Sequence, residues 1–202
     1  MKNKKIFLFI IFALIILISF YFDSEIMEGI SLIRNNFLDG FFGVLTLLSN
    51  EIILFFLLTG LFLVYKSNRK FILPLWTVIF LSAIISFLLK FTIKRLRPFQ
   101  LGIGGGLLPV LLEKSYSIWN FSFPSFQSML VFSVLPLISK EFPRIKKIWI
   151  VFACLVALSR VYFGLHFLSD VIAGGLIGYL AGIIILKKEK FFDKVYNKIF
   201  RK

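Results

Sequence analysis

The only histidine of the 202-residue sequence, His166, stands between an arginine and an aspartate in the segment from Ser159 to Asp170. His166 and Asp170 are four residues apart, so on a helix both would lie on one face and the carboxylate could hold one imidazole nitrogen. The other nitrogen would be free to act as a nucleophile or a base. The guanidinium of Arg160 suits an anionic substrate, phosphate above all. The alternative for an isolated pair of this kind is a histidine at a membrane interface with an ordinary ion pair.

Two further segments carry residues suited to the same kind of substrate. Lys90 and Arg97 are seven residues apart, about two helical turns, so both can project along one side of a helix that ends before Pro98. Pro124 and Ser125 can open another helix, whose free backbone N–H groups form an anion site. Each segment alone has a structural explanation, as interface-anchoring cations or as a helix cap. Together on one face, the three segments predict a phosphate site.

The composition indicates an integral membrane protein. Hydrophobic residues make up 59% of the chain, phenylalanine occurs 27 times, and the mean hydropathy is +0.93. The net charge of +14 could suggest a nucleic-acid partner, but the basic residues form short clusters between apolar runs, as membrane flanks do. We therefore expect no nucleic acid. Cys154 is the only cysteine, which excludes an internal disulfide and a cysteine-based zinc site.

The apolar runs predict an all-α fold, a six-span transmembrane helical bundle that forms a single domain over residues 1–202. An interfacial amphipathic helix is expected after the first span, over residues 23–39. The glycine-rich residues 98–123 are expected to form an outer loop or lid, and the basic tail 187–202 an amphipathic helix on anionic lipid. The expected spans cover residues 6–22, 42–65, 71–89, 125–138, 148–162 and 168–186.

The distribution of cations predicts the orientation. Most of the 24 lysines and arginines fall at the two termini and in alternate connections, which places these parts in the cytoplasm by the positive-inside rule. We expect a multi-pass protein of the plasma membrane with both termini cytoplasmic and the site on the extracytoplasmic face. The cations on that disfavoured face gather at residues 90–97 and beside His166, and binding an anion explains them.

The three segments, taken in order, resemble the type 2 phosphatidic acid phosphatase family. The matching patterns are Lys-x6-Arg-Pro, Pro-Ser-x-x and Ser-Arg-x5-His-x3-Asp, over residues 90–170. The resemblance implies a phosphatase that needs no metal ion or other cofactor and works through a phosphohistidine. It makes His166 the nucleophile and Asp170 its orienting carboxylate. It also implies that the phosphate is held by Lys90, Arg97, Arg160, Ser125 and the backbone N–H of Phe126.

The chain departs from this family at two positions. The family's middle pattern usually ends in Gly-His, and that histidine protonates the leaving oxygen, whereas here Phe126 and Gln127 follow Ser125. Phe126 still offers a backbone donor but narrows the pocket. Gln127 takes the position of the catalytic acid, where it can donate a hydrogen bond but cannot give up a proton at neutral pH. General acid help is worth roughly 10²–10⁴ in rate, so Gln127 predicts a reduced activity.

Three explanations for Gln127 remain open at this point. The first is a pyrophosphate substrate, because a phosphate leaving group with a second pKa of ~6 needs far less protonation than an alcohol with a pKa near 15.7. This favours a polyprenyl-pyrophosphate phosphatase over an enzyme for a lipid monophosphate. The second is a protein that binds or flips a lipid phosphate without hydrolysis. The third is a histidine deliberately replaced to trap a complex.

Two other functions are alternatives to hydrolysis. A phosphotransferase would pass the phosphate from His166 to a lipid or sugar acceptor instead of water, and the sequence does not separate it from a hydrolase. A channel or transporter is disfavoured, because the ionisable residues cluster at one surface instead of along a path through the spans. The expected partners are a lipid phosphate or pyrophosphate substrate and membrane lipids.

Overall fold

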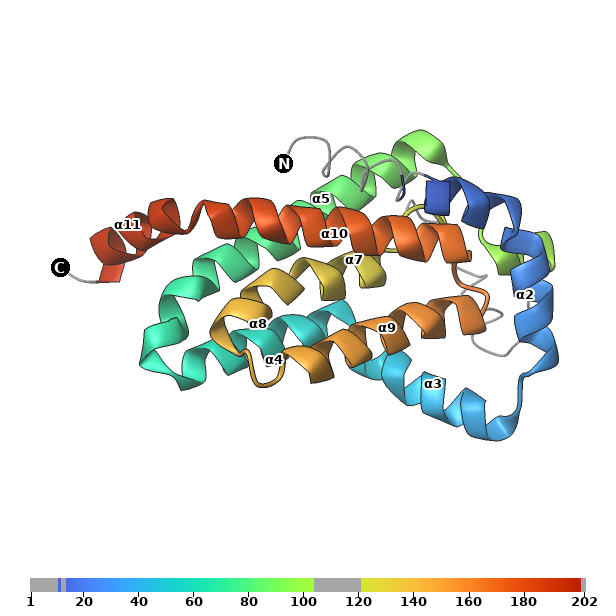
Figure 1. Cartoon of the computed structure of the whole chain (residues 1–202), viewed down its shortest axis with the longest axis horizontal. Coiled ribbons are helices and arrows are strands. Elements are labelled where there is room, and N and C mark those ends of the chain that lie inside the picture. The colour runs from blue at the N-terminus through green and yellow to red at the C-terminus, as the bar shows by residue number, and fades with distance from the viewer. Residues whose placement is uncertain (1–10, 12–13, 104–120, 201–202) are drawn as a thin grey trace.

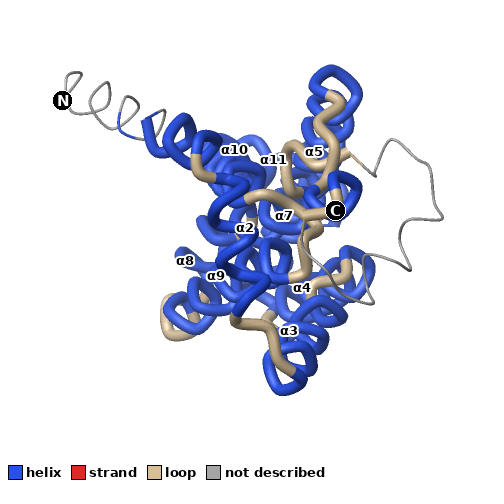
Figure 2. The backbone as a smooth tube through the Cα atoms, turned by 90° about the vertical axis from the view of Figure 1, so that its right-hand side faces the viewer, coloured by secondary structure: helices blue, strands red, loops and turns tan. Residues whose placement is uncertain are grey.

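The computed structural model describes residue 11 and residues 14–103 and 121–200. All regular elements in this part of the chain are helices, as Figure 2 shows, which confirms the predicted all-α class. Much of the first predicted span, residues 6–22, lies outside the described residues. Most of the predicted outer loop, residues 98–123, lies outside them as well.

The helices run mainly along one axis of the molecule. In Figure 1, α10 and α11 follow one another along this axis with α7 beside α10, and α2 crosses the end at which α9 joins α10. The α-helices are α2 (Asp23–Leu32), α3 (Asn36–Leu48), α4 (Glu51–Val64), α5 (Ile72–Ile93), α7 (Phe126–Ser133), α8 (Leu135–Glu141), α9 (Lys146–Tyr162), α10 (Leu168–Lys187) and α11 (Glu189–Phe200), and two short 3-10 helices are η1 (Lys66–Phe71) and η2 (Pro98–Leu101).

The span predicted over residues 42–65 is broken into two helices. Helices α3 and α4 meet at an angle of 62°. The side-chain oxygen of Asn50 accepts hydrogen bonds from the backbone N–H groups of Ile52 at 3.0 Å and Ile53 at 3.4 Å. An asparagine that satisfies the first free N–H groups of a helix favours a new helix start at that point. Asn50 therefore restarts the chain as α4 in a new direction.

Two described helices are long and apolar enough to cross a membrane, over residues 69–101 and 168–187, and the bent α3–α4 pair could supply a third. The six predicted spans are therefore not confirmed. The run predicted over residues 125–138 is also divided, because α7 ends before Val134 and Pro136 lies in the first turn of α8, where proline is favoured.

The residues after the first predicted span form a helix that ends earlier than expected. The prediction covered residues 23–39, whereas α2 ends at Leu32 and α3 begins at Asn36. Helix α2 packs against α9 and α10, and Asp23 and Met27 are its buried side chains. The location of this helix along a membrane interface stays a prediction.

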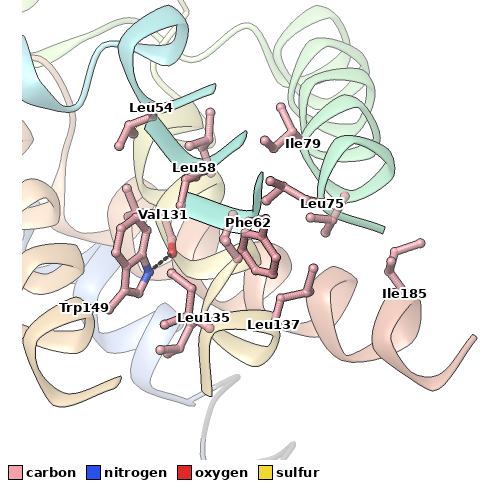
Figure 3. Close-up of a cluster of buried hydrophobic side chains, with 14 of the residues drawn as sticks. Leu54, Leu58, Phe62, Leu75, Ile79, Val131, Leu135, Leu137, Trp149 and Ile185 are labelled. Atoms are coloured by element: carbon pink, nitrogen blue, oxygen red, sulfur yellow. Dashed lines mark hydrogen bonds between the residues drawn. The ribbon is translucent and has the colours of Figure 1, made fainter. Parts of the chain in front are cut away.

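A cluster of buried apolar side chains joins α4, α5, α7, α8, α9 and α10 (Figure 3). Within it, the indole N–H of Trp149 donates to the backbone carbonyl of Val131 at 2.9 Å. Val131 lies in the last turn of α7, where backbone carbonyls lack partners within the helix. This hydrogen bond therefore fixes the end of α7 against α9, which carries Arg160.

Glycines on one face of α10 allow it to lie directly on α7. A Cβ added to Gly174 would stand 2.4 Å from the backbone oxygen of Ser125, and one on Gly178 would stand 2.1 Å from that of Met129. Gly182 continues the same stripe one turn further. Small residues at this four-residue spacing let two helix backbones approach closely. The contact places Ser125, at the start of α7, beside the first turns of α10.

Candidate active site

The three segments singled out from the sequence meet at one end of the helical bundle. They are the residues after α5, the start of α7 and the α9–α10 connection, and this end lies beside α2 in Figure 1. The backbone N–H of Ser122 donates to the carbonyl of Arg95 at 2.7 Å, and that of Ser125 donates to the carbonyl of Asp170 at 3.0 Å. Backbone hydrogen bonds thus hold the three segments together.

A cleft of about 850 Å³ opens at this end. Six of the predicted site residues line it: Lys90, Arg97, Phe126, Gln127, Arg160 and His166. The other two, Ser125 and Asp170, are fully buried and are not among the described residues that line the cleft. The structure therefore gathers the predicted cations and the histidine around one space, with Ser125 and Asp170 behind its wall.

Two of the cations in the cleft are almost completely buried. Lys90 is 1% exposed and donates to the carbonyl of Phe121, and Arg160 is 4% exposed and donates to the hydroxyl of Ser49 and, at 3.5 Å, to the carbonyl of Thr46. Neither makes an ion pair with a described carboxylate, and Nε of Arg160 has no hydrogen-bond partner among the described residues. Burying unpaired charge is costly, so this arrangement is suited to an anion that supplies the missing partner.

The contacts of His166 determine which ring nitrogen carries the proton. Its Nδ1 lies 2.7 Å from the backbone carbonyl of Ser122. A carbonyl can only accept, so this hydrogen bond requires the proton on Nδ1 and leaves Nε2 with a lone pair. His166 lines the cleft while being 1% exposed. The ring is thus held in the tautomer that a nucleophile needs.

The surroundings of His166 also keep the imidazole neutral. Burial lowers the pKa of His166 well below its ordinary value of 6.5, and the positive charges of Arg97, Lys90 and Arg160 lower it further. The hydrogen bond to Ser122 acts in the opposite direction and does not reverse the shift. A neutral imidazole among cations retains its lone pair at physiological pH.

Asp170 does not hydrogen-bond to His166. Its Oδ2 lies 3.9 Å from Nδ1, and the carboxylate instead accepts from the hydroxyl of Ser122, from the backbone N–H of Phe167 at 2.9 Å and from Arg95 at 2.8 Å. The expected direct contact assumed that both residues lie on one helix. His166 precedes α10, which begins at Leu168, so the four-residue helical spacing does not apply. Ser122 stands between the two side chains.

The two positions at which the chain departs from the resembling pattern both face the cleft. Gln127 is half-buried and Phe126 lies next to it at the start of α7. Behind them, the hydroxyl of Ser125 accepts from that of Ser128 at 3.1 Å. A glutamine at this place can hydrogen-bond to a substrate oxygen but supplies no proton.

Three residues that the sequence patterns did not identify belong to this site, namely Ser122, Arg95 and Asp23. Ser122 contacts His166 across 44 residues of sequence, and no spacing rule connects the two. Arg95 was visible only as one cation of the basic cluster. Asp23 is 2% exposed. Its position at the end of an apolar run was the one sequence signal for these contacts, because a carboxylate placed there needs a partner.

The rest of the cleft is largely apolar. Side chains of α4 and α5 line it away from the cations, among them Phe55, Ile79 and Phe80. Asn50 and Glu51, at the break between α3 and α4, add polar groups to the wall. The cleft thus offers a cationic end and an apolar side, which together fit an amphiphile with an anionic head group.

Comparison with known proteins gives related enzymes. Residues 71–192 match the model of the PAP2 superfamily. The chain is 34% identical over 125 residues to phosphatidylglycerophosphatase B of Bacillus subtilis (strain 168), covering 56% of this chain and 54% of that protein. It is 32% identical over 124 residues to undecaprenyl-diphosphatase of Sulfolobus acidocaldarius, covering 59% and 56%. The matched region thus spans about half the length of these curated relatives.

The fold is also shared with a solved membrane protein. The crystal structure of a transmembrane PAP2-type phosphatidylglycerolphosphate phosphatase from Bacillus subtilis superposes with a TM-score of 0.69 at 25% sequence identity. The superposition covers 90% of this chain and 95% of that one. The family match includes all of α5 to α10, and with them Lys90, Arg97, Arg160 and His166. From its sequence, its fold and the residues of its cleft, the chain is a membrane protein that belongs to the PAP2 superfamily.

Proposed function

We propose that this protein is a membrane lipid phosphatase that hydrolyses a lipid phosphate or pyrophosphate. The observation that carries the proposal is the cleft itself, in which the buried cations Lys90 and Arg160 stand beside a neutral His166 and an apolar wall continues from them. An anionic head group would lie among the cations and its hydrocarbon along the wall. Lipid phosphatase names among the relatives agree with this chemistry.

In the proposed reaction, Nε2 of His166 attacks the phosphorus atom. A nitrogen–phosphorus bond forms, the bond from phosphorus to the leaving oxygen breaks, and the leaving group takes the electron pair. The negative charge that spreads over the transferred phosphoryl group is stabilised by Lys90, Arg97 and Arg160. Water then attacks phosphorus, which releases inorganic phosphate and restores the imidazole. One proton of the water stays on the released phosphate. The other passes to the leaving group when this is an alkoxide, or to bulk solvent when it is a phosphate.

The remaining predicted residues have supporting roles in this proposal. The backbone N–H of Ser125 donates to the backbone carbonyl of Asp170. The start of α7, which carries Ser125 and Phe126, would face the phosphate as a helix N-terminus. Asp170 acts on His166 through Ser122. The three cations neutralise the phosphate, so the reaction as proposed requires no metal ion or other cofactor.

Gln127 directs the proposal toward a pyrophosphate. The leaving group from a lipid pyrophosphate is itself a phosphate, with a second pKa of about 6, so it departs without a proton from the enzyme. A lipid monophosphate releases an alcohol, which needs one. We therefore propose a polyprenyl pyrophosphate as the preferred substrate, in line with the undecaprenyl-diphosphatase among the relatives.

The proposal includes an orientation in the membrane. The cluster of cations at residues 90–97 and beside His166 would lie at the extracytoplasmic face of the plasma membrane, with both termini in the cytoplasm. The whole chain would act as one domain, with the basic tail from residue 187 onward at the anionic cytoplasmic lipid surface.

The test is phosphate release by the purified full-length protein on matched lipid substrates. One set contains a polyprenyl pyrophosphate and the corresponding monophosphate, and the other contains phosphatidate and phosphatidylglycerophosphate. We expect the highest kcat/KM on the pyrophosphate and none above background for the control variant His166→Ala. Faster hydrolysis of phosphatidate would contradict the pyrophosphate preference.

The same panel decides between hydrolysis and the alternatives. The alternative that Gln127 raises is a protein that binds a lipid phosphate without cleaving it, and such a protein would bind the lipids and release no phosphate from any of them. A phosphotransferase would release phosphate slowly and label an added lipid or sugar acceptor instead. Either result would replace hydrolysis as the function.

A further inference from the structure

Arg95 joins two carboxylates from distant parts of the chain. Its Nη1 lies 2.8 Å from Oδ1 of Asp170 and 2.7 Å from the hydroxyl of Ser169, and its Nη2 lies 2.8 Å from Oδ2 of Asp23. Asp23 precedes Arg95 by 72 residues and belongs to α2, whereas Asp170 belongs to α10. A planar guanidinium with several fixed donors suits such a double contact, and a lysine does not.

The surroundings of Arg95 fix the plane of its guanidinium. The guanidinium carbon lies 4.1 Å from the ring centre of Phe167 and 4.6 Å from that of Phe20. Cation–π contacts of this kind stabilise the charge and restrict its orientation. Arg95 therefore has little freedom to turn away from either carboxylate.

Asp23 is held as firmly as its partner. It is 2% exposed, its Oδ1 accepts from the backbone N–H of Ser169 at 3.1 Å, and its Oδ2 accepts from the hydroxyl of the same serine. That hydroxyl also accepts from Arg95, so Ser169 connects the two charged groups. The carboxylate of Asp23 is thus satisfied in a geometry that aims it at Arg95.

The same group of contacts continues to the histidine. Oδ2 of Asp170 accepts from the hydroxyl of Ser122, and the carbonyl of Ser122 accepts from Nδ1 of His166 at 2.7 Å. Arg95 contacts the other oxygen of Asp170, so that both oxygens of this carboxylate are fixed. The orientation of the imidazole therefore depends on a chain of hydrogen bonds that begins at Asp23.

The formal charges of Asp23, Arg95 and Asp170 add up to one negative charge on the Nδ1 side of His166. Asp170 and Arg95 alone would cancel, and Asp23 restores the negative charge. His166 becomes positively charged when Nε2 takes up a phosphoryl group, and a net negative charge on the Nδ1 side stabilises that state. A purely structural role, in which Asp23 only fastens α2 to α10, would not require this balance.

We propose that Asp23 and Arg95 are positioning residues for His166, holding Asp170 and Ser122 in place and supplying the charge balance for the phosphorylated imidazole. This inference rests on the proposed phosphatase function. It assigns a role in the reaction to a residue of α2, outside the segment of residues 71–192 that matches the family.

The test compares Asp23→Asn with Glu25→Gln in the full-length protein, using the best substrate of the wild type. Both variants remove one carboxylate from α2, but Glu25 is exposed. For Asp23→Asn we expect kcat to fall by about 10- to 100-fold, the usual effect of losing a partner that orients a functional side chain. KM and inhibition by inorganic phosphate should stay unchanged, because the cation cluster is intact. Glu25→Gln should behave like the wild type.

A double-variant cycle tests whether Asp23 acts through Arg95. If it does, adding Asp23→Asn to Arg95→Gln should lower kcat little further, because contacting residues are not additive. Equal and independent losses would overturn the inference. If Asp23→Asn does not fold, Ser169→Ala removes only the hydroxyl between the two residues, and its kcat must then fall with KM unchanged.

Two further results would overturn the inference while leaving the proposed function intact. One is an Asp23→Asn variant with wild-type kcat. The other is a variant that loses phosphate inhibition in proportion to kcat, which would show a general structural role. Failure of the proposed function would look different, because the wild-type protein itself would release no phosphate.

Discussion

Replacing Gln127 with histidine should change the substrate preference of this protein. Residue 127 and His166 line the same cleft, so an imidazole at position 127 would face the leaving group of a substrate attacked by Nε2 of His166. Position 127 is half-buried and in the first turn of α7, which leaves room for a side chain of similar size. The variant would regain a group that can give up a proton near neutral pH.

The size of the effect depends on the leaving group. General acid catalysis contributes roughly 10²–10⁴ in rate, equivalent to about 3–5 kcal/mol of activation free energy. This gain applies to a lipid monophosphate, whose alcohol has a pKa near that of water at about 15.7. It does not apply to a pyrophosphate, whose leaving phosphate has a second pKa of about 6. We expect Gln127→His to raise kcat on the monophosphate by about 100-fold or more, and on the pyrophosphate by much less.

The assay is phosphate release from a matched pair of lipids with the same hydrocarbon chain. Gln127→Asn is the control, because it keeps the amide and shortens the side chain by one methylene group. Equal gains on both substrates would refute the reasoning, since protonation of the leaving group would then not distinguish them. An unchanged rate on the monophosphate, in a variant that still binds inorganic phosphate, would refute it as well.

Two further predictions concern packing and protonation. Gly178→Ala should lower the free energy of unfolding by about 1–3 kcal/mol, because its Cβ would stand 2.1 Å from the backbone oxygen of Met129, whereas Gly60→Ala, with nothing within 4 Å, should raise it by up to about 1 kcal/mol. Thermal unfolding in detergent checks both, and equal shifts would contradict the close approach of α7 and α10. His166 should stay neutral as the pH falls from about 8 to about 6, because its pKa is lowered well below 6.5. Because the chain has one histidine, NMR of isotope-labelled histidine reports the protonation of His166 alone. A titration midpoint near the ordinary pKa of 6.5 would contradict the description of the site.

The cation cluster could be predicted from the sequence because each of its members stands at the end of an apolar run. The positive-inside rule predicts that Lys90, Arg97 and Arg160 lie on the disfavoured face of the membrane, and this predicted anomaly indicated a shared anion. The structure brings all three to the cleft that His166 lines. The predicted position of these cations relative to the membrane therefore indicated the site, which the residue spacing within any one motif did not.

The contacts behind His166 could not be predicted, because they depend on tertiary structure. The four-residue spacing of His166 and Asp170 suggested a direct contact, but the helix begins only at Leu168 and Ser122 takes the intermediate position. Asp23 and Arg95 meet across 72 residues. The packing of α2 and of α5 against α10 brings them together.

Hydropathy alone also could not predict where helices break within the apolar runs. Residues 42–65 are apolar enough to read as one span, although Asn50 and Glu51 lie within them. Its side chain caps α4 and turns the chain by 62°. This break places Ser49 under the guanidinium of Arg160 and Glu51 on the wall of the cleft. Because Asn50 caps α4, this segment forms two helices where one span was predicted, and the wall of the cleft has a different shape.

The most direct test of the proposed mechanism is to trap the phosphorylated protein. His166 is the only histidine of the chain, so any phosphohistidine formed must lie at this residue. Rapid quenching of the purified protein with a labelled polyprenyl pyrophosphate should give a base-stable, acid-labile label that appears before inorganic phosphate and is absent from His166→Ala. Phosphate release at full rate with no label on His166 at any time would contradict the mechanism.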